Sequence, residues 1–170
     1  MLEWLWQGIG VAVFALIGYG AWMGAFHRVM IRSASAPAGC FVYQNLTATD
    51  YPSIQRQSEA VEGWLEAHGL GQRVAMQIYR YDGSAHQVGY CLPADSALPA
   101  LPSGFHCREL APRPALVSEF IWRNVASYAV AMTRVPPALL RAYGQAPSSA
   151  AEMQVQLQAG QMLFRFVPPA

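Results

Sequence analysis

The chain has 170 residues, which is enough for one apolar segment and one compact domain of about 130 residues. Its 11 basic and 10 acidic residues give a net charge of +1, and they form no basic stripe of the kind that binds nucleic acid. Hydrophobic residues make up 54% of the chain and charged residues only 12%, so it is more apolar than an ordinary globular protein.

The first feature along the chain is an apolar segment from Trp4 to Phe26 that has no charged side chain. At 1.5 Å per residue, a helix over this segment is about 34 Å long, which exceeds a hydrocarbon core of about 30 Å. Trp6 lies near its start and Trp22 near its end, where the membrane interface favours aromatic rings. The sequence therefore predicts a single transmembrane helix, with residues 1–32 as the anchor and its flanks.

The charges that flank this segment predict its direction. Glu3 precedes it, whereas His27, Arg28 and Arg32 follow it. Because basic residues prefer the cytoplasmic side, we expect an inner (cytoplasmic) membrane protein with its N-terminus outside and its C-terminal domain in the cytoplasm. His27 is also a candidate ligand for a haem or pigment, although an interfacial histidine beside two arginines is the simpler interpretation.

Small residues form a stripe along the predicted membrane helix. Gly20 and Gly24 make a GxxxG pair, and Gly8 and Ala12 repeat the same spacing. Small side chains on one face let a second helix approach closely in lipid. We therefore expect Gly8, Ala12, Gly20 and Gly24 to pack against a transmembrane protein partner, although glycine is in any case common in membrane helices.

The rest of the chain is predicted to be a short linker followed by one domain. Residues 33–40 are small and flexible, as in a linker, and residues 41–170 carry the periodic patterns of a folded domain. The first half of that domain predicts a strand over 41–46, a helix from Thr49 or Asp50 to His68, and strands over 74–79 and 87–92.

The second half repeats this order after a proline-rich bridge. Pro136 and Pro137 interrupt a helical pattern and are expected to split or kink it. Met153, Val155 and Leu157 alternate with glutamines, as expected of a half-buried strand. The duplication predicts an α+β fold of two β-α-β-β modules whose helices flank a central groove. The elements predicted here are strands over 105–110 and 115–122, a helix over 125–143, and a hairpin of 152–158 with 161–167.

The reactive residues of the domain form no recognisable constellation. Cys40, Cys91 and Cys107 are odd in number and have no CxxC spacing, which predicts free thiols in a reducing compartment rather than disulfides or a zinc site. The sequence has no nucleophile-elbow motif and no phosphate-binding glycine loop. We therefore expect no catalytic residue, no metal and no cofactor, and hence a protein that is not an enzyme.

Several short motifs in the domain also occur in a known family. Thr-Asp-Tyr-Pro-Ser-Ile at 49–54 enters the predicted first helix, and Gly-Trp-Leu-Glu-Ala-His-Gly-Leu at 63–70 ends it. Residues 78–82 and 89–93 form the hairpin of the first repeat, and Phe-Val-Pro at 166–168 closes the last strand. Together they resemble the GyrI-like domain, the duplicated module of bacterial multidrug-sensing regulators, and more distantly the SOUL haem-binding fold. The resemblance implies a small-molecule-binding groove.

One departure from this family concerns the charge of the pocket. In the sensing members, an acidic residue in the last strand attracts cationic drugs, but the corresponding stretch from Leu163 to Phe166 has no carboxylate. Glu119 is a substitute if it points inward, although a strand glutamate more often faces solvent. Aromatic residues suit a planar ligand, although they also dominate ordinary cores. The candidate ligand-binding residues are Tyr51, Tyr79, Glu119, Trp122 and Phe164.

Three hypotheses from different classes follow. The first is a membrane-anchored, non-catalytic accessory or scaffold subunit of a larger membrane protein complex, of respiratory or photosynthetic type, favoured by the glycine stripe and the missing pocket carboxylate. The alternative is a membrane-tethered binder of small apolar molecules or haem-like ligands, which the resemblance implies. A hydrolase on the same fold is the third, without a catalytic constellation to support it. We favour the first.

Overall fold

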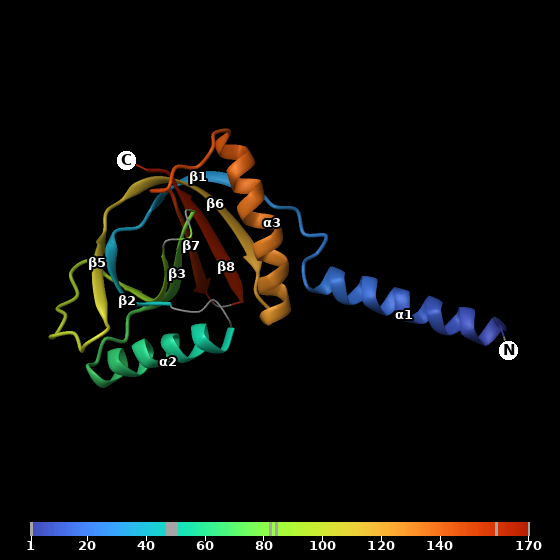
Figure 1. The fold of residues 1–170 in the computed structure, drawn as a ribbon, viewed down its shortest axis with the longest axis horizontal. Coiled ribbons are helices and arrows are strands. Elements are labelled where there is room, and N and C mark those ends of the chain that lie inside the picture. The colour runs from blue at the N-terminus through green and yellow to red at the C-terminus, as the bar shows by residue number, and fades with distance from the viewer. Residues whose placement is uncertain (1, 47–50, 82, 84, 159, 170) are drawn as a thin grey trace.

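The computed structural model describes residues 2–46, 51–81, 83, 85–158 and 160–169, with the side chains of residues 2–8 and 51 outside the description. A long N-terminal helix projects from a sheet-based domain, and two further helices pack on that domain (Figure 1). The helices are α1 (Leu2–Trp22), α2 (Tyr51–Ala67) and α3 (Val125–Tyr143). The strands are β1 (Ile31–Ala36), β2 (Gly39–Asn45), β3 (Val74–Arg80), β4 (His86–Leu92), β5 (His106–Leu110), β6 (Arg113–Ile121), β7 (Glu152–Gln158) and β8 (Gln161–Val167).

The described strands form one antiparallel sheet in the order β1-β6-β8-β7-β3-β4-β2-β5. The order is that of a duplication, because β2, β4 and β3 of the first module correspond to β6, β8 and β7 of the second. The two modules join where β3 pairs with β7. β5 extends the first module beside β2, and β1 extends the second beside β6. The predicted α+β fold with a duplicated β-α-β-β module is confirmed.

The helices α2 and α3 pack on the same face of the sheet, one on each module. Both are amphipathic, with buried residues three or four positions apart that face the strands. These residues are Val61 and Leu65 in α2, and Val135 and Leu139 among others in α3. Asn124 begins α3, since its side-chain oxygen accepts hydrogen bonds from two backbone N–H groups of the first turn. We call the sheet surface under these helices the helix face.

The opposite surface of the sheet is also buried, because the sheet curls around it. In the sheet order, β3, β4 and β2 separate β5 from β7. Nevertheless Arg108 of β5 donates hydrogen bonds to both carboxylate oxygens of Glu152 in β7, at 2.7 and 3.0 Å. Figure 1 shows the strands wrapping round, with β1 and β5 approaching each other. We call this second surface the curled face.

The helix α1 differs from the predicted membrane helix. It ends at Trp22, whereas the predicted span ran from Trp4 to Phe26. Within the described part of the chain, none of the helices combines the length and the hydropathy that a bilayer crossing needs. The predicted transmembrane span is therefore not found among the described residues.

The end of α1 is fixed by a turn against the domain. Gly24 has a positive φ of 87°, and a β-carbon at this position would lie 2.8 Å from the ring of Phe120. Met23 is buried, and Arg134 of α3 donates to the carbonyls of Gly24 and Ala25 at 2.8 and 2.5 Å. Gly24 is therefore a turn residue beyond the helix, and it does not continue the stripe of small residues.

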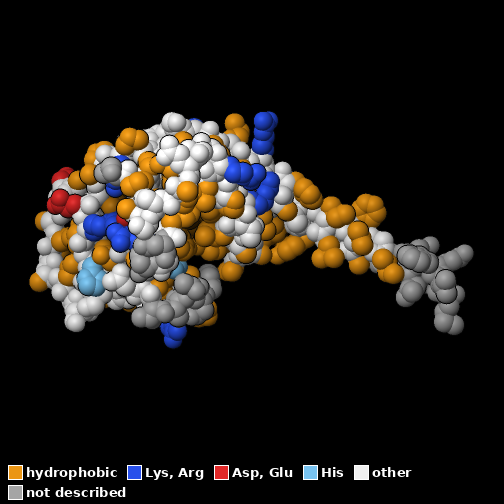
Figure 2. All heavy atoms as spheres, turned by 45° about the horizontal axis from the view of Figure 1, so that its top comes forward, with side chains coloured by type: hydrophobic (Ala, Val, Ile, Leu, Met, Phe, Trp, Pro, Cys, Tyr) orange, Lys and Arg blue, Asp and Glu red, His pale blue; other side chains and the backbone are white. Residues whose placement is uncertain are grey.

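On the N-terminal side of this turn, α1 projects away from the domain with apolar side chains on its surface (Figure 2). Phe14 and Leu16, for example, are 78% and 70% exposed. Ala12 is exposed as well, and Gly20 is half-buried. The packing of Gly8, Ala12 and Gly20 against another helix stays a prediction.

Two local predictions differ from the structure. Most of the expected linker over residues 33–40 belongs to the sheet, because β1 pairs with β6 and β2 begins at Gly39. The small side chains that suggested a linker fit a crowded sheet edge, where Ala36 is buried. The helix α3 runs unbroken through Pro136 and Pro137, so the expected split of this helix is wrong.

The cysteines also differ from the prediction of free thiols. Cys40 of β2 and Cys107 of β5 form a disulfide, whereas Cys91 is free and buried. The two bonded residues are 67 positions apart in sequence, but the pairing of β2 with β5 brings their Cα atoms to 6.4 Å. That separation lies within the range that a disulfide spans.

Candidate functional site

A cleft on the helix face lies over the seam where the two modules join. It opens between α2 and α3, has strands β3 and β7 at its floor, and has a volume of about 150 Å³. Alternation along β3 explains the polar floor, since Gln77 shares its side of the strand with Tyr79. The residues that line the cleft are Ile54, Gln55, Ser58, Glu59, Gln77, Trp122, Tyr128 and Leu157.

A cluster of polar and aromatic groups lies at this floor. The hydroxyls of Tyr79 and Tyr128 are hydrogen-bonded to each other, and the Gln77 side-chain oxygen lies 2.5 Å from the first and 3.1 Å from the second. His86 Nε2 lies 3.3 Å from the same oxygen, and its ring stacks on Tyr79 with centroids 4.0 Å apart. One amide oxygen therefore organises three side chains from both modules.

Burial controls the ionisation of this cluster. Removal from water raises the pKa of Tyr79, and the neighbouring Tyr128 raises it further. Burial also raises the pKa of Tyr128 and lowers the pKa of His86 to about 4. The cluster is thus neutral near pH 7, with hydroxyls that donate hydrogen bonds and do not act as bases.

The wall contributed by α2 carries the charge of the cleft. Glu59 is exposed at the rim and accepts a hydrogen bond of 2.8 Å from the side-chain amide of Gln55, one helical turn before it. Ser58 lies 3.3 Å from the Tyr90 hydroxyl and so joins α2 to β4. A carboxylate at the rim and aromatic rings within it give the cleft a weakly negative, largely apolar surface.

The structure brings three of the five predicted ligand-binding residues together. Tyr79 and Trp122 are half-buried at the cleft, and both pack on the cluster that contains Phe164, which is fully buried beneath them. Glu119 lies apart from this group and forms an exposed ion pair with Arg32. The Tyr51 side chain lies outside the described residues.

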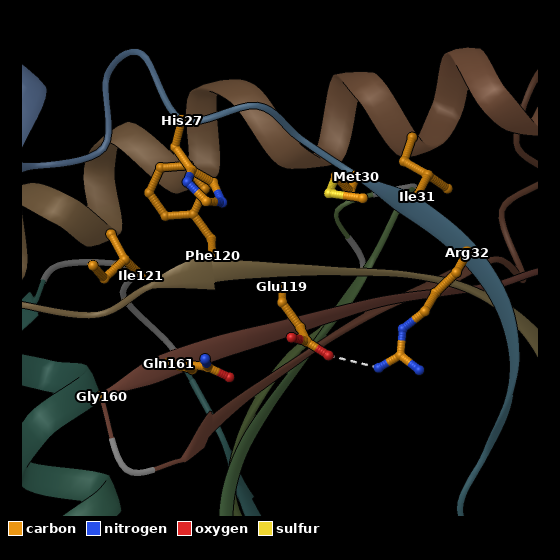
Figure 3. Close-up of a pocket in the computed structure, with 9 residues that line it drawn as sticks. All are labelled: His27, Met30, Ile31, Arg32, Glu119, Phe120, Ile121, Gly160 and Gln161. Atoms are coloured by element: carbon orange, nitrogen blue, oxygen red, sulfur yellow. Dashed lines mark hydrogen bonds and ion pairs between the residues drawn. The ribbon is translucent and has the colours of Figure 1, made fainter.

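Glu119 belongs to a second, larger cavity, shown in Figure 3. This cavity has a volume of about 600 Å³ and lies between β6 and the chain segment that joins α1 to β1. The Glu119 carboxylate and the Arg32 guanidinium form an ion pair of 2.6 Å and neutralise each other. The His27 ring packs edge-on against the Phe120 ring. The cavity therefore presents mainly apolar groups and a neutralised pair.

Several cleft residues were missed by the sequence analysis. Glu59 was not singled out because a glutamate on a helix is ordinary, and Gln77 was not singled out because it lies among apolar strand residues. The signal for Gln77 was its two-residue spacing from Tyr79, which places both on one face of the strand. Among the described residues, no group of His, Cys, Asp and Glu is arranged to hold a metal ion.

No protein-family model matches the chain, and no curated protein matches it. A structure of EcmrR, in the EcmrR–DNA complex in EcmrR-RPo, superposes with a TM-score of 0.59 and 10% identity, over 99% of this chain and 70% of that one. SAV2435 bound to tetraphenylphosphonium superposes with a TM-score of 0.52 and 12% identity, over 83% of this chain and 94% of that one. At such identities the likeness concerns the fold alone.

Proposed function

We propose that the cleft on the helix face binds small aromatic molecules, with lipophilic organic cations as the preferred class. Trp122 and Tyr128 supply ring surface, Gln77 supplies a hydrogen-bonding oxygen, and Glu59 supplies a carboxylate at the rim. Ring faces and a nearby carboxylate attract a large, weakly hydrated cation. SAV2435, which has the same fold, was solved with tetraphenylphosphonium bound.

The observation that carries the proposal is the composition of the seam. The helix face is otherwise an apolar core, yet at the junction of the modules it holds a connected set of side-chain hydrogen bonds among Gln77, Tyr79 and Tyr128. Buried polar groups at the floor of an otherwise apolar cleft are typical of small-molecule sites. The raised tyrosine pKa values keep these groups as donors, which suits binding rather than acid–base catalysis.

The volume of the cleft sets a condition on this binding. At about 150 Å³ it is smaller than the sites that take drug-sized ligands, which start at about 300 Å³. The buried anchors of α2, Val61 and Leu65, lie in its second half, whereas the lining residues Ile54 to Glu59 lie in its first half. We therefore expect the first half of α2 to move outward when a larger ligand enters.

The proposal replaces the scaffold hypothesis of the sequence analysis. That hypothesis depended on a membrane-spanning helix, which the described part of the chain does not contain. It depended also on the absence of a pocket carboxylate in the last strand. Glu59 now supplies a carboxylate to the cleft from α2.

Calorimetric titration of the full chain with methyltriphenylphosphonium tests the proposal, with neutral triphenylphosphine oxide as the matched ligand. Trp122→Ala should weaken binding of both compounds by roughly 5-fold, because each loses an aromatic contact worth about 1 kcal/mol. Glu59→Gln should weaken binding of the cation by a factor of about 3 and leave the neutral ligand unchanged, since the rim charge is exposed to solvent.

Trp64→Ala is the matched control for the tryptophan, because Trp64 packs against His68 and Phe105 at the far end of α2. Its replacement should leave both affinities unchanged. The proposal is wrong if neither compound binds saturably, or if Trp64→Ala weakens binding as much as Trp122→Ala does.

A further inference from the structure

A second site is indicated on the curled face by Arg165 of β8. Phe164 and Phe166 on either side of it point to the helix face, so alternation directs Arg165 to the opposite surface. Arg165 is only 8% exposed, and its Nη1 atom is buried without a hydrogen-bond partner. A buried guanidinium that lacks a partner is rare in folded proteins and costs free energy.

The surroundings of Arg165 do not neutralise its charge. The pairing of β8 with its neighbours places it beside Val117 of β6 and Gln154 of β7. Burial lowers the pKa of Arg165, and the ionisable groups that affect it are Cys91 and another arginine, Arg32. On the described part of this face, Glu152 is paired with Arg108 and Glu119 with Arg32, so both carboxylates are already bound to other arginines.

The pairing of Arg108 shows by contrast what Arg165 lacks. Arg108 lies on the same curled face and donates two hydrogen bonds to the Glu152 carboxylate. A planar guanidinium and a carboxylate match each other through two parallel hydrogen bonds. The Arg165 guanidinium can donate the same two parallel hydrogen bonds, but the space in front of it holds no described side-chain carboxylate.

That space is a cleft of about 500 Å³ at one end of the curled face. Arg73 also borders it, but its guanidinium is already bound to Glu62 and Glu66 of α2, at 3.1 and 2.5 Å. The remaining lining combines glutamine amides with apolar groups. The lining residues are Pro37, Ala38, Gln72, Arg73, Val74, Cys91, Leu92, Pro93, Gln156, Gln158 and Arg165.

We propose that this cleft binds a small organic acid, with its carboxylate on the Arg165 guanidinium and its carbon skeleton against Val74 and Pro93. Gln156 is a second donor for the carboxylate. Its amide nitrogen now contacts only the Met76 sulfur, at 3.6 Å, which is a weak acceptor that an anionic oxygen outcompetes.

The site is separate from the cleft of the proposed function. The two lie on opposite faces of the sheet, since Gln77 of β3 points to the helix face and its neighbour Met76 points to the curled face. Failure of cation binding at the first cleft would therefore not contradict the anion site, and failure of anion binding would not contradict the first cleft. An organic anion is also opposite in charge to the ligand proposed for the first cleft.

Thermal unfolding of the full chain in the presence of benzoate tests this inference, with uncharged benzamide as the matched ligand. At a benzoate concentration about 100-fold above its Kd, linkage predicts a rise in Tm of roughly 5–10 °C. Benzamide should give no comparable rise. Arg165→Met should abolish the benzoate effect and leave the Tm without ligand unchanged or higher, because it removes an uncompensated buried charge.

Arg56→Met is the control, since Arg56 is exposed on α2 and bonds only within that helix, to Pro52 and Ser53. It should retain the full benzoate effect. Arg165→Lys keeps the charge but loses the fork, so benzoate affinity should fall by about 10-fold; this variant carries the test if Arg165→Met does not fold. The inference is overturned if benzoate gives no saturable rise, if Arg165→Met retains it, or if inorganic phosphate stabilises the protein and benzoate does not.

Discussion

The two faces of the sheet are built from the same strands, and along β7 and β8 they bury different chemistries. On the helix face, β7 and β8 present Val155, Phe164 and their apolar neighbours to α3, and polar groups are confined to the seam between the modules. On the curled face, the same strands present Gln154, Gln156 and Arg165, which are 4%, 3% and 8% exposed. Both faces exclude water, but on the curled face these polar side chains lie beside apolar clusters that include Phe41, Met76 and Val117.

The difference shows that the polar side of an alternating strand is not necessarily a surface. On the helix face, apolar area removed from water stabilises the packing. On the curled face, polar groups need partners, and the Arg108–Glu152 ion pair provides them across the curl. Arg165 has no such partner, which makes the curled face the better place to look for a second ligand.

The largest expected effect is a loss of stability when a side chain is added between β4 and β2. It tests whether the curled sheet depends on close contact between these two strands. Gly89 of β4 lies where a β-carbon would be 1.9 Å from the Val42 carbonyl oxygen and 2.7 Å from Tyr43 Cα. Gly89→Ala should therefore lower the free energy of unfolding by at least about 4 kcal/mol, measured by urea denaturation. Gly63→Ala, on the open side of α2, should raise it by about 0.5–1 kcal/mol. Equal small effects would contradict a tightly curled sheet.

An effect of intermediate size comes from comparing a buried arginine–glutamate ion pair with an exposed one. Glu152 is 8% exposed, so Glu152→Gln leaves Arg108 without a charge partner and should cost about 2–4 kcal/mol of unfolding free energy. Glu119→Gln breaks the exposed pair with Arg32 and should cost less than about 1 kcal/mol. Chemical denaturation of the two variants measures both values. A cost for Glu119→Gln that matches that of Glu152→Gln would show that burial does not distinguish the two pairs.

The smallest expected effect concerns the seam on the helix face. Burial lowers the pKa of His86 to about 4, whereas an unfolded histidine titrates near 6.5. The unfolded state thus binds more protons between these values, so stability present above pH 6.5 is lost as pH falls towards 4, by about 1–3 kcal/mol. His86→Phe should remove this loss in urea denaturation between pH 7 and 4. The exposed His106→Gln should retain it, and a retained loss in His86→Phe would refute the assignment.

Most secondary structure was predictable because its signals are local. The alternation in 152–158 and 161–167 identified β7 and β8 to the residue, and the periodic pattern over 125–143 did the same for α3. Composition was a poorer guide, since it predicted a linker at 33–40 where β1 pairs with β6. An edge strand of small residues has no apolar alternation by which it can be recognised.

The candidate site was predictable only in part. Aromatic content drew attention to Trp122, which lines the cleft, and to Tyr79, which is hydrogen-bonded to the lining residues Gln77 and Tyr128; their role in binding stays a prediction. Gln77 and Glu59 escaped notice because a glutamine in a strand and a glutamate on a helix are ordinary in isolation. Their proximity follows from the docking of α2 on β4 and β2, next to β3, which no short-range pattern encodes.

By itself, the sequence determined most of the segments that form helices and strands, the apolar side of β7, and that one module occurs twice. These properties follow from the periodicity of neighbouring residues. The tertiary structure decided that the polar side is buried, that Arg108 meets Glu152, and that Arg165 remains unpaired. It also decided that the chain turns at Gly24 instead of continuing the helix. Each of these outcomes depends on how a twisted sheet curls and brings together residues far apart in sequence.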